Sequence, residues 1–222
     1  TLFAGWRLVP AGLLLLGIAR LRGKSLRIRI DQYRIVATVG LFLLVGGMYF
    51  TFLAEQTIPS GLAALIVALL PLWVALAESF IPGMDRPTAR GYLGLVIGFG
   101  GLAVLIAPRL TGITGTPAEL GGIALQILGT WLWTTGSIVS KRNPVDVDSM
   151  VATGYEMLTA GAVLVAVGSL AGEWPRFALT PTGAAALAYL IVMGSSVAFT
   201  AFVWLLKHAP ASKVMTYAYV NP

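Results

Sequence analysis

The sequence predicts an all-α, polytopic membrane protein, and three observations support this fold class. Of the 222 residues, 57% are hydrophobic and 11% are charged, whereas water-soluble domains carry about 25% charged residues. The mean hydropathy of +0.85 over the whole chain leaves no room for a sizeable soluble domain. Apolar runs recur near the length of about 20 residues that a helix needs to cross a bilayer.

Seven such runs and one partial run follow one another along the chain. They cover residues 2–19, 35–54, 61–80, 91–108, 120–140, 149–171 and 183–206, and the partial run starts at 211. Short separators with helix breakers, such as Pro59, Pro82 and Pro175, divide them. We expect helices because lipid offers backbone groups no hydrogen-bond partners and the runs lack the alternation of barrel strands.

The distribution of lysine and arginine predicts the orientation. One set of alternate loops holds twelve of these cations, while the other set holds only Arg109 and Arg176. Cytoplasmic loops carry the excess of positive charge. We therefore expect residue 1 outside the membrane, and the loops 20–34, 81–90, 141–148 and 207–213 in the cytoplasm. The net charge of +6 is interpreted as topology anchoring, with no nucleic-acid partner.

The chain also repeats itself. Residues 57–71 and 208–222 share two prolines at the same interval, with an offset of 151, and residues 4–12 match 153–161 at an offset of 149. The partners are five spans apart, and this odd number turns the second copy upside down. Many secondary transporters have this inverted-repeat design. We expect one repeat over 1–112, lacking its first helix, and another over 113–222, truncated in its fourth helix, within a protein of ten spans.

The sequence resembles a known family over essentially all 222 residues. The likeness is carried by Gly5-Trp6-Arg7 with Ala11-Gly12, Ala54–Gln56 with Pro59–Gly61, Pro71-Leu72, Gly94–Gly101, Glu156-Met157 with Ala160-Gly161, and Tyr217–Pro222. These motifs are similar to the ten-helix EamA-type family of the drug/metabolite transporter superfamily. The resemblance implies a bacterial inner-membrane exporter of amino acids, their analogues or drugs. The family often has Gly-Glu after its fourth helix, but here Met84 follows Gly83, which leaves the subfamily open.

Two ionisable residues within spans are candidates for the substrate pathway, because charges in the hydrocarbon region are costly and usually functional. Glu156 lies about eight residues into its span, roughly 10 Å along the helix. It can take up and release a proton during transport, or it can hold two helices together. Arg7 is its counterpart in the first repeat, and it can either extend to the outer surface or hold an anionic group.

Other pathway candidates are polar residues at a helix end, aromatic residues within spans, and residues at proline breaks. They are Tyr49, Glu55, Gln56, Pro71, Trp131, Tyr155, Tyr217, Tyr219 and Asn221. Glu55 and Gln56 end the third run and are expected at a mouth or loop. Pro71 and Pro222 each remove one helical hydrogen bond, which predicts a break or kink in the helix.

Two other function classes, an intramembrane enzyme and a channel, have less support in the sequence. An intramembrane enzyme such as an acyltransferase needs a nucleophile with a base, but the one histidine, His208, is expected at a cytoplasmic helix end. The sequence shows no Gly-x-Ser-x-Gly, phosphate loop or metal-ligand spacing, so we predict no enzyme, no cofactor and no metal. A channel-like permease remains a further alternative, although no filter-like segment is visible. The expected partners are a small-molecule substrate and the lipid bilayer; proton coupling and a homodimer are left open.

Overall fold

The computed structural model describes residues 1–84, 86–109, 115–177 and 179–220, and in these residues the chain forms helices and no strand. This confirms the all-α fold class. The helices are α1 (Leu2–Leu21), α2 (Ile30–Gly40), η1 (Leu41–Tyr49), α3 (Phe50–Ala54), α4 (Ser60–Val67), α5 (Leu70–Phe80), α6 (Ala89–Ile106), η2 (Ala107–Arg109), α7 (Pro117–Arg142), α8 (Ser149–Leu170), η3 (Trp174–Arg176), α9 (Pro181–Tyr189), η4 (Leu190–Val197), α10 (Ala198–His208), α11 (Ala211–Val214) and η5 (Met215–Tyr219).

Five helical stretches of the described residues are long and apolar enough to cross a membrane, which confirms a polytopic membrane protein. They are Leu2–Leu21, Ile30–Ala54, Ser60–Phe80, Ser149–Leu170 and Pro181–His208. Ala89–Leu105 is a shorter apolar helix. The sequence predicts a further span over 120–140, where α7 lies; this helix has 26 residues but is less apolar than the five, because polar side chains occupy one of its faces.

Short polar residues fix several helix starts. Asp148 caps α8 by accepting a hydrogen bond from the Met150 N–H at 2.9 Å. Thr180 caps α9 through the Gly183 N–H at 3.1 Å. Such side chains replace the helical partners that the first N–H groups of a helix lack. The breaks between spans therefore follow from local sequence.

The chain forms two compact units, each described here by itself. Unit 1 comprises residues 1–45 and 143–207, and unit 2 comprises residues 46–142 and 208–222. Each unit takes helices from both halves of the sequence. The predicted repeats, 1–112 and 113–222, are defined by similarity within the sequence, whereas the units are defined by spatial contacts. The units therefore do not test the repeats, which stay a prediction.

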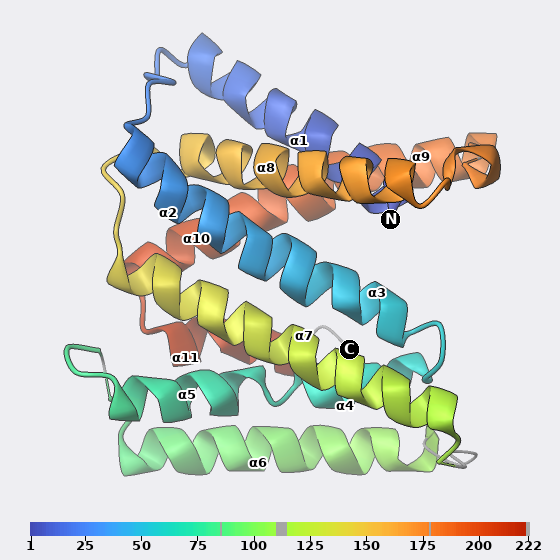
Figure 1. The fold of residues 1–222 in the computed structure, drawn as a ribbon. Coiled ribbons are helices and arrows are strands. Elements are labelled where there is room, and N and C mark those ends of the chain that lie inside the picture. Colours follow the sequence, from blue (N-terminus) through green and yellow to red (C-terminus); the bar gives the residue numbers. More distant parts are fainter. Residues whose placement is uncertain (85, 110–114, 178, 221–222) are drawn as a thin grey trace. The chain divides into compact units, whose positions relative to one another are not determined.

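In unit 1, α1 packs along α8 in the antiparallel direction (Figure 1). A Cβ atom on Gly5 would lie 2.6 Å from the Val165 side chain, and one on Gly154 would lie 2.8 Å from Leu16. The two contacts are equivalent: the offset of 149 converts Gly5 into Gly154 and Leu16 into Val165. The two helices thus exchange roles in this pair of contacts.

A second pair of contacts repeats this exchange. A Cβ atom on Gly12 would lie 2.9 Å from the Leu158 side chain, and one on Gly161 would lie 2.8 Å from Val9. The same offset relates Gly12 to Gly161 and Val9 to Leu158. The glycines allow the two backbones to approach closely, as small residues do between membrane helices.

Wide π-helical turns occur at equivalent places in two long helices. η1 covers Leu41–Tyr49 between α2 and α3, and η4 covers Leu190–Val197 between α9 and α10. Both segments begin 149 residues apart. π-helical turns are rare and are frequent at functional sites, so their recurrence is a second structural likeness between the halves.

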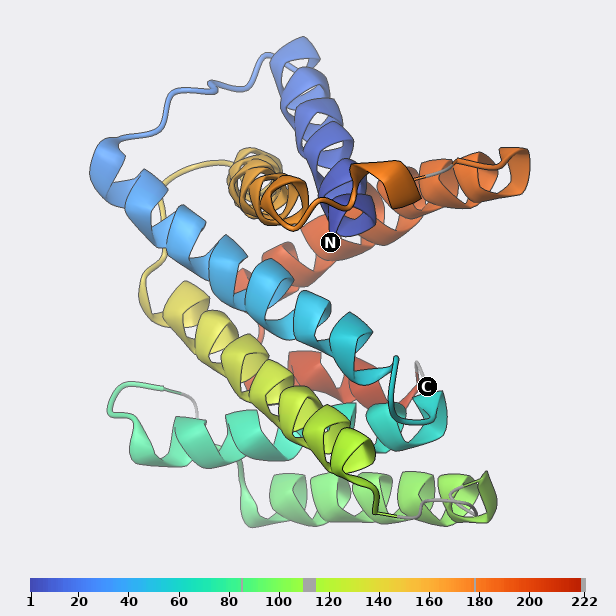
Figure 2. The same cartoon turned by 45° about the vertical axis from the view of Figure 1, so that its right-hand side comes forward.

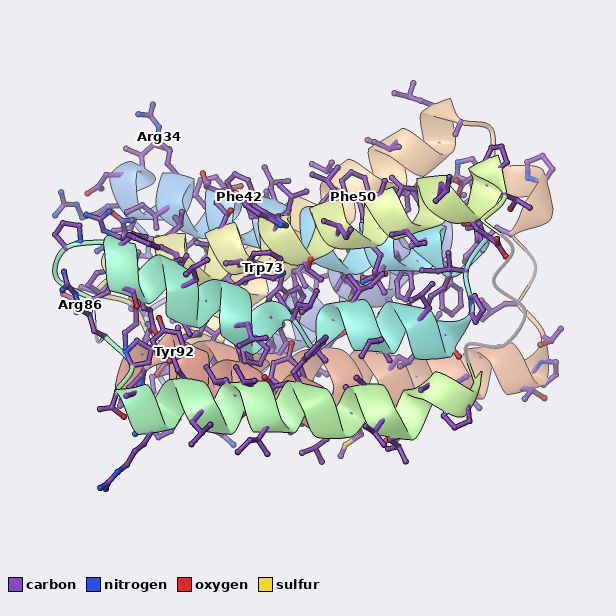
Figure 3. The ribbon with its side chains drawn as sticks, turned by 90° about the horizontal axis from the view of Figure 1, so that it is seen from below. Arg34, Phe42, Phe50, Trp73, Arg86 and Tyr92 are labelled. Atoms are coloured by element: carbon purple, nitrogen blue, oxygen red, sulfur yellow. The ribbon has the colours of Figure 1, made fainter. Side chains whose placement is uncertain are left out.

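In unit 2, α5 packs against α6, α7 and α11. The stretch α4–α5 and the stretch α11–η5 run in opposite directions, as both Figure 1 and Figure 2 show. The helix breaks before Pro71, because α4 ends at Val67 and α5 begins at Leu70. Tyr92 of α6, labelled in Figure 3, reaches α5 and donates a hydrogen bond to the Ala75 carbonyl at 2.9 Å.

Candidate functional site

Glu156 is the most deeply placed carboxylate among the candidates in unit 1. Its side chain is 3% exposed, and its Oε2 atom has no hydrogen-bond partner in the described residues. Gly40 of α2 packs against the Glu156 backbone so closely that a Cβ there would lie 2.6 Å from its carbonyl oxygen. Buried polar atoms normally have partners, so this unpaired oxygen is an exception among the buried polar atoms of unit 1.

Lys207 of α10 is a partly buried basic residue in the same unit as Glu156. No ion pair within 4.0 Å joins the two in the part of the chain that the structure describes. The Lys207 ammonium instead donates to the Val147 carbonyl at 3.2 Å. Among the described residues, Lys207 therefore does not neutralise Glu156 by direct contact.

Arg7 lies on α1 and contacts η4. Its Nε atom donates to Ser195 Oγ at 2.9 Å, and Ser195 is 1% exposed. Gly194 leaves space for the guanidinium, because a Cβ there would lie 3.1 Å from an Arg7 nitrogen. Arg7 is half-buried and, among the described residues, forms no ion pair with Glu156. The described contacts therefore do not join the two predicted counterparts directly.

Tyr155 contacts the connection between α1 and α2. Its hydroxyl donates to the Leu26 carbonyl at 2.9 Å, and its ring meets Tyr33 edge-on with centroids 6.0 Å apart. This hydroxyl already donates its one hydrogen, so in this conformation it can only accept a further hydrogen bond.

The aromatic candidates in unit 2 lie on η1, α7 and η5. Trp131 is 54% exposed and its ring lies 5.3 Å from that of Trp73, which Figure 3 labels on α5. Tyr219 donates to the Leu95 carbonyl at 2.9 Å. Tyr217 is 37% exposed. These rings are spread over several helices.

The remaining candidates lie at helix ends or breaks. Glu55 and Gln56 are exposed immediately after α3. Tyr49 pairs with Phe50 at the end of η1, with centroids 6.3 Å apart. Pro71 is buried at the break between α4 and α5. Asn221 lies outside the described residues.

A buried polar face of α7 was missed by the sequence reasoning. It consists of Gln126, Thr130, Thr134 and Ser137. Gln126 donates to Thr51 Oγ1 at 3.1 Å, but Gln126 Oε1 and Thr134 Oγ1 have no partner in the described residues. The signal was available, because polar residues three or four apart in an apolar run share one helix face.

Glu78 near the end of α5 was missed as well. It is fully buried, and its two carboxylate oxygens accept the backbone N–H groups of Ala211 and Ser212 at 2.9 and 3.3 Å. A carboxylate in the last turn of a helix is unfavourable beside the negative end of that helix. This unfavourable position predicts that Glu78 has a hydrogen-bond partner elsewhere, but only the structure shows that the partners are the N–H groups of Ala211 and Ser212.

Comparison with known proteins assigns the chain to a family. The sequence model of the EamA-like transporter family matches residues 1–107 and 120–222. The uncharacterized inner membrane transporter YedA of Escherichia coli K12 is 34% identical over 222 residues, which cover all of this chain and 70% of YedA. The WAT1-related chloroplastic protein At3g02690 of Arabidopsis thaliana is 29% identical, with 99% of this chain and 54% of that protein covered.

A solved crystal structure shows the same fold. It superposes with a TM-score of 0.82 at 23% sequence identity, covering all of this chain and 74% of the other. The family match, the relatives and the apolar helices agree with the resemblance expected from the sequence. The chain belongs to the EamA-like transporter family and is a multi-pass membrane transporter.

Proposed function

We propose that this protein is a secondary transporter that exports small metabolites, such as amino acids, their analogues or drugs, by alternating access across a bacterial inner membrane. The observation that carries the proposal is the exchange of contacts between α1 and α8, in which Gly5–Val165 and Gly154–Leu16 are equivalent. Inverted repeats of this kind let a carrier open to either side around one site.

Other features support the two repeats. The family model matches the chain in two segments, and the wide turns η1 and η4 begin at equivalent positions. In unit 2, α4 and α11, which follow the equivalent prolines Pro59 and Pro210, run in opposite directions. Each is what an inverted repeat over 1–112 and 113–222 requires.

Contacts within each unit support the proposed orientation. In unit 1, Lys24 of the first basic loop pairs with Asp148 at 3.2 Å. In unit 2, the Lys141 ammonium donates to the Ala209 carbonyl at 2.6 Å. Basic loops that we assign to the cytoplasm thus meet at the same end of their unit.

We assign Glu156 to proton coupling or substrate binding. A glutamate that only holds two helices together would use both oxygens in contacts, whereas Glu156 Oε2 has none in the described residues. Arg7, on the equivalent helix, is suited to an anionic group of the solute, because a guanidinium can bind a carboxylate with two hydrogen bonds. We assign two further groups to the solute pathway across the membrane: the residues Glu55 and Gln56 at its mouth, and the aromatic candidates.

The test of the function is transport by the intact protein in proteoliposomes. Cells overproducing the protein are first screened for resistance to amino-acid analogues and toxic cations, and the solute class that gives resistance is then supplied as labelled solute. A carrier gives saturable counterflow of unchanged solute. Chemical conversion of the solute would instead indicate an enzyme, and flux that does not saturate in the same range would indicate a channel.

A Glu156→Gln variant tests the coupling role. We expect net efflux driven by a pH gradient to fall by about tenfold or more, the effect of ~1.4 kcal/mol on a rate, while counterflow without a gradient persists. Asp146→Asn, which neutralises an exposed carboxylate in the connection between α7 and α8, is the control. Efflux that matches the wild type at every pH would remove Glu156 from coupling.

A further inference from the structure

The start of α11 is held by a carboxylate from another helix. Glu78 of α5 is 0% exposed, and its Oε1 and Oε2 atoms accept the N–H groups of Ala211 and Ser212, the first two residues of α11. Ala211 and Ser212 are themselves buried, at 0% and 5% exposure. Glu78 therefore satisfies two donors that water does not reach.

The chemistry of the helix start explains why an outside carboxylate is needed. Pro210 is the N-cap residue of α11 and provides no side-chain hydrogen bond. The first N–H groups of a helix lack helical partners, and leaving them unpaired in an apolar interior is costly. They also form the positive end of the helix dipole, which favours a negative group.

A second contact holds the residue on the other side of Pro210. The Lys141 ammonium at the end of α7 donates to the Ala209 carbonyl at 2.6 Å. The backbone of residues 209–212 is thus held on both sides of Pro210. Lys141 of α7 binds the carbonyl group before the proline, and Glu78 of α5 binds the two N–H groups after it. We call Glu78, Lys141 and this backbone segment the α11 latch.

The equivalent helix start in the other half has no such contact. α4 begins after Pro59, the proline that the offset of 151 relates to Pro210, and Pro59 and Ser60 are exposed. In the described part of the chain, no side chain accepts a hydrogen bond from the first N–H groups of α4. Of the two helix starts that the offset relates, the start of α11 is therefore bound by a side chain from another helix. Among the described residues, the start of α4 is not.

We infer that the α11 latch is a conformational device of the transport cycle: Glu78 and Lys141 hold the start of α11 in the conformation described here and release it when that end of unit 2 opens. This inference rests on the proposed alternating access. Glu78 and Lys141 act as positioning residues, because they set the place of α11 and of η5, which carries Tyr217 and Tyr219.

Thiol labelling tests the latch, and the absence of cysteine from the chain makes any introduced thiol a unique probe. Ser212→Cys is placed in the intact protein in inside-out membrane vesicles and treated with a membrane-impermeant maleimide. We expect slow labelling with the latch intact and labelling about tenfold faster when Glu78→Gln or Lys141→Met is added. The amide of glutamine has one acceptor atom for two donors, and methionine keeps the length of lysine without its charge.

Ala75→Cys, on the same helix as Glu78 and 0% exposed, is the control for general loosening. Its labelling should stay slow in every background. Equal labelling of Ser212→Cys with and without the latch substitutions would overturn the inference, and so would an equal rise at Ala75→Cys. If Glu78→Gln does not yield folded protein, Lys141→Met decides. Counterflow by the wild-type protein is measured separately. Absence of saturable counterflow would reject the carrier function. Normal counterflow together with unchanged labelling of Ser212→Cys would reject only the latch.

Discussion

At the scale of single residues, Asp148 shows how one carboxylate can serve a helix start and a connection together. It accepts the Met150 N–H at the start of α8 and pairs with Lys24 of the α1–α2 connection at 3.2 Å. Partial burial alone would raise its pKa, but the Met150 N–H and the Lys24 ammonium outweigh this and hold the pKa of Asp148 below its usual range.

Substitution of Asp148 separates the cap from the charge. Asp148→Ala removes the cap and should lower the free energy of unfolding by about 1 kcal/mol. Asp148→Asn keeps a capping oxygen and should lose less, because asparagine caps helices about as well as aspartate. Thermal unfolding in detergent at neutral pH compares the two, and equal losses would show that the cap contributes nothing.

The lowered pKa also gives a pH dependence. The stabilising charge is fully present above the pKa in the unfolded chain, about 3.9, and is lost as the pH falls through the lower pKa of the folded state. The difference in unfolding temperature between the wild type and Asp148→Asn should therefore be present at neutral pH and shrink below about pH 4. A difference that grew on acidification would have the wrong sign.

Residues were predicted from the sequence with uneven success, for a physical reason. Glu156 stands out because a charge in the middle of an apolar run has few explanations. Glu78 lies at the end of a run beside a loop, where a solvated carboxylate is ordinary, and its partners are backbone groups 133 and 134 residues away. No local pattern indicates so distant a contact.

At the scale of helices, the α1–α8 contact depends on the absence of side chains at a few positions. A Cβ on Gly12 would lie 2.8 Å from the Gly154 carbonyl oxygen, and backbone atoms cannot move aside as a side chain can. Gly12→Ala should therefore destabilise the protein by about 1–3 kcal/mol. Gly17→Ala is the matched control on the same helix, because nothing lies within 4 Å of its Cβ; it should be neutral or stabilise by about 0.5–1 kcal/mol. Thermal unfolding of both variants in detergent compares them, and equal effects would show that the contact is not tight.

Helix breaks could be predicted from the sequence where a proline causes them. Pro71 has no N–H and interrupts its helix in any environment, and the structure breaks between Val67 and Leu70. The wide turns η1 and η4 contain no proline. Without a proline at these places, no breaker in the sequence indicates them.

At the scale of the whole chain, composition, run length and charge predicted an all-α polytopic protein, and these signals are strong because the bilayer restricts the available folds. The two compact units were not predicted, because internal likeness identifies repeats but not which helices pack together. Each unit combines helices from both halves, and the pairing of Gly5 with Val165 shows that equivalent helices are direct neighbours.

The most direct test of the account asks whether equivalent positions in the two repeats face opposite sides of the membrane. Thr57 and His208 are both exposed and are related by the offset of 151. In the cysteine-free chain, a membrane-impermeant maleimide should label Thr57→Cys in intact cells and His208→Cys only in inside-out vesicles. Labelling of both positions from the same side would contradict the inverted repeat, and the proposed carrier mechanism with it.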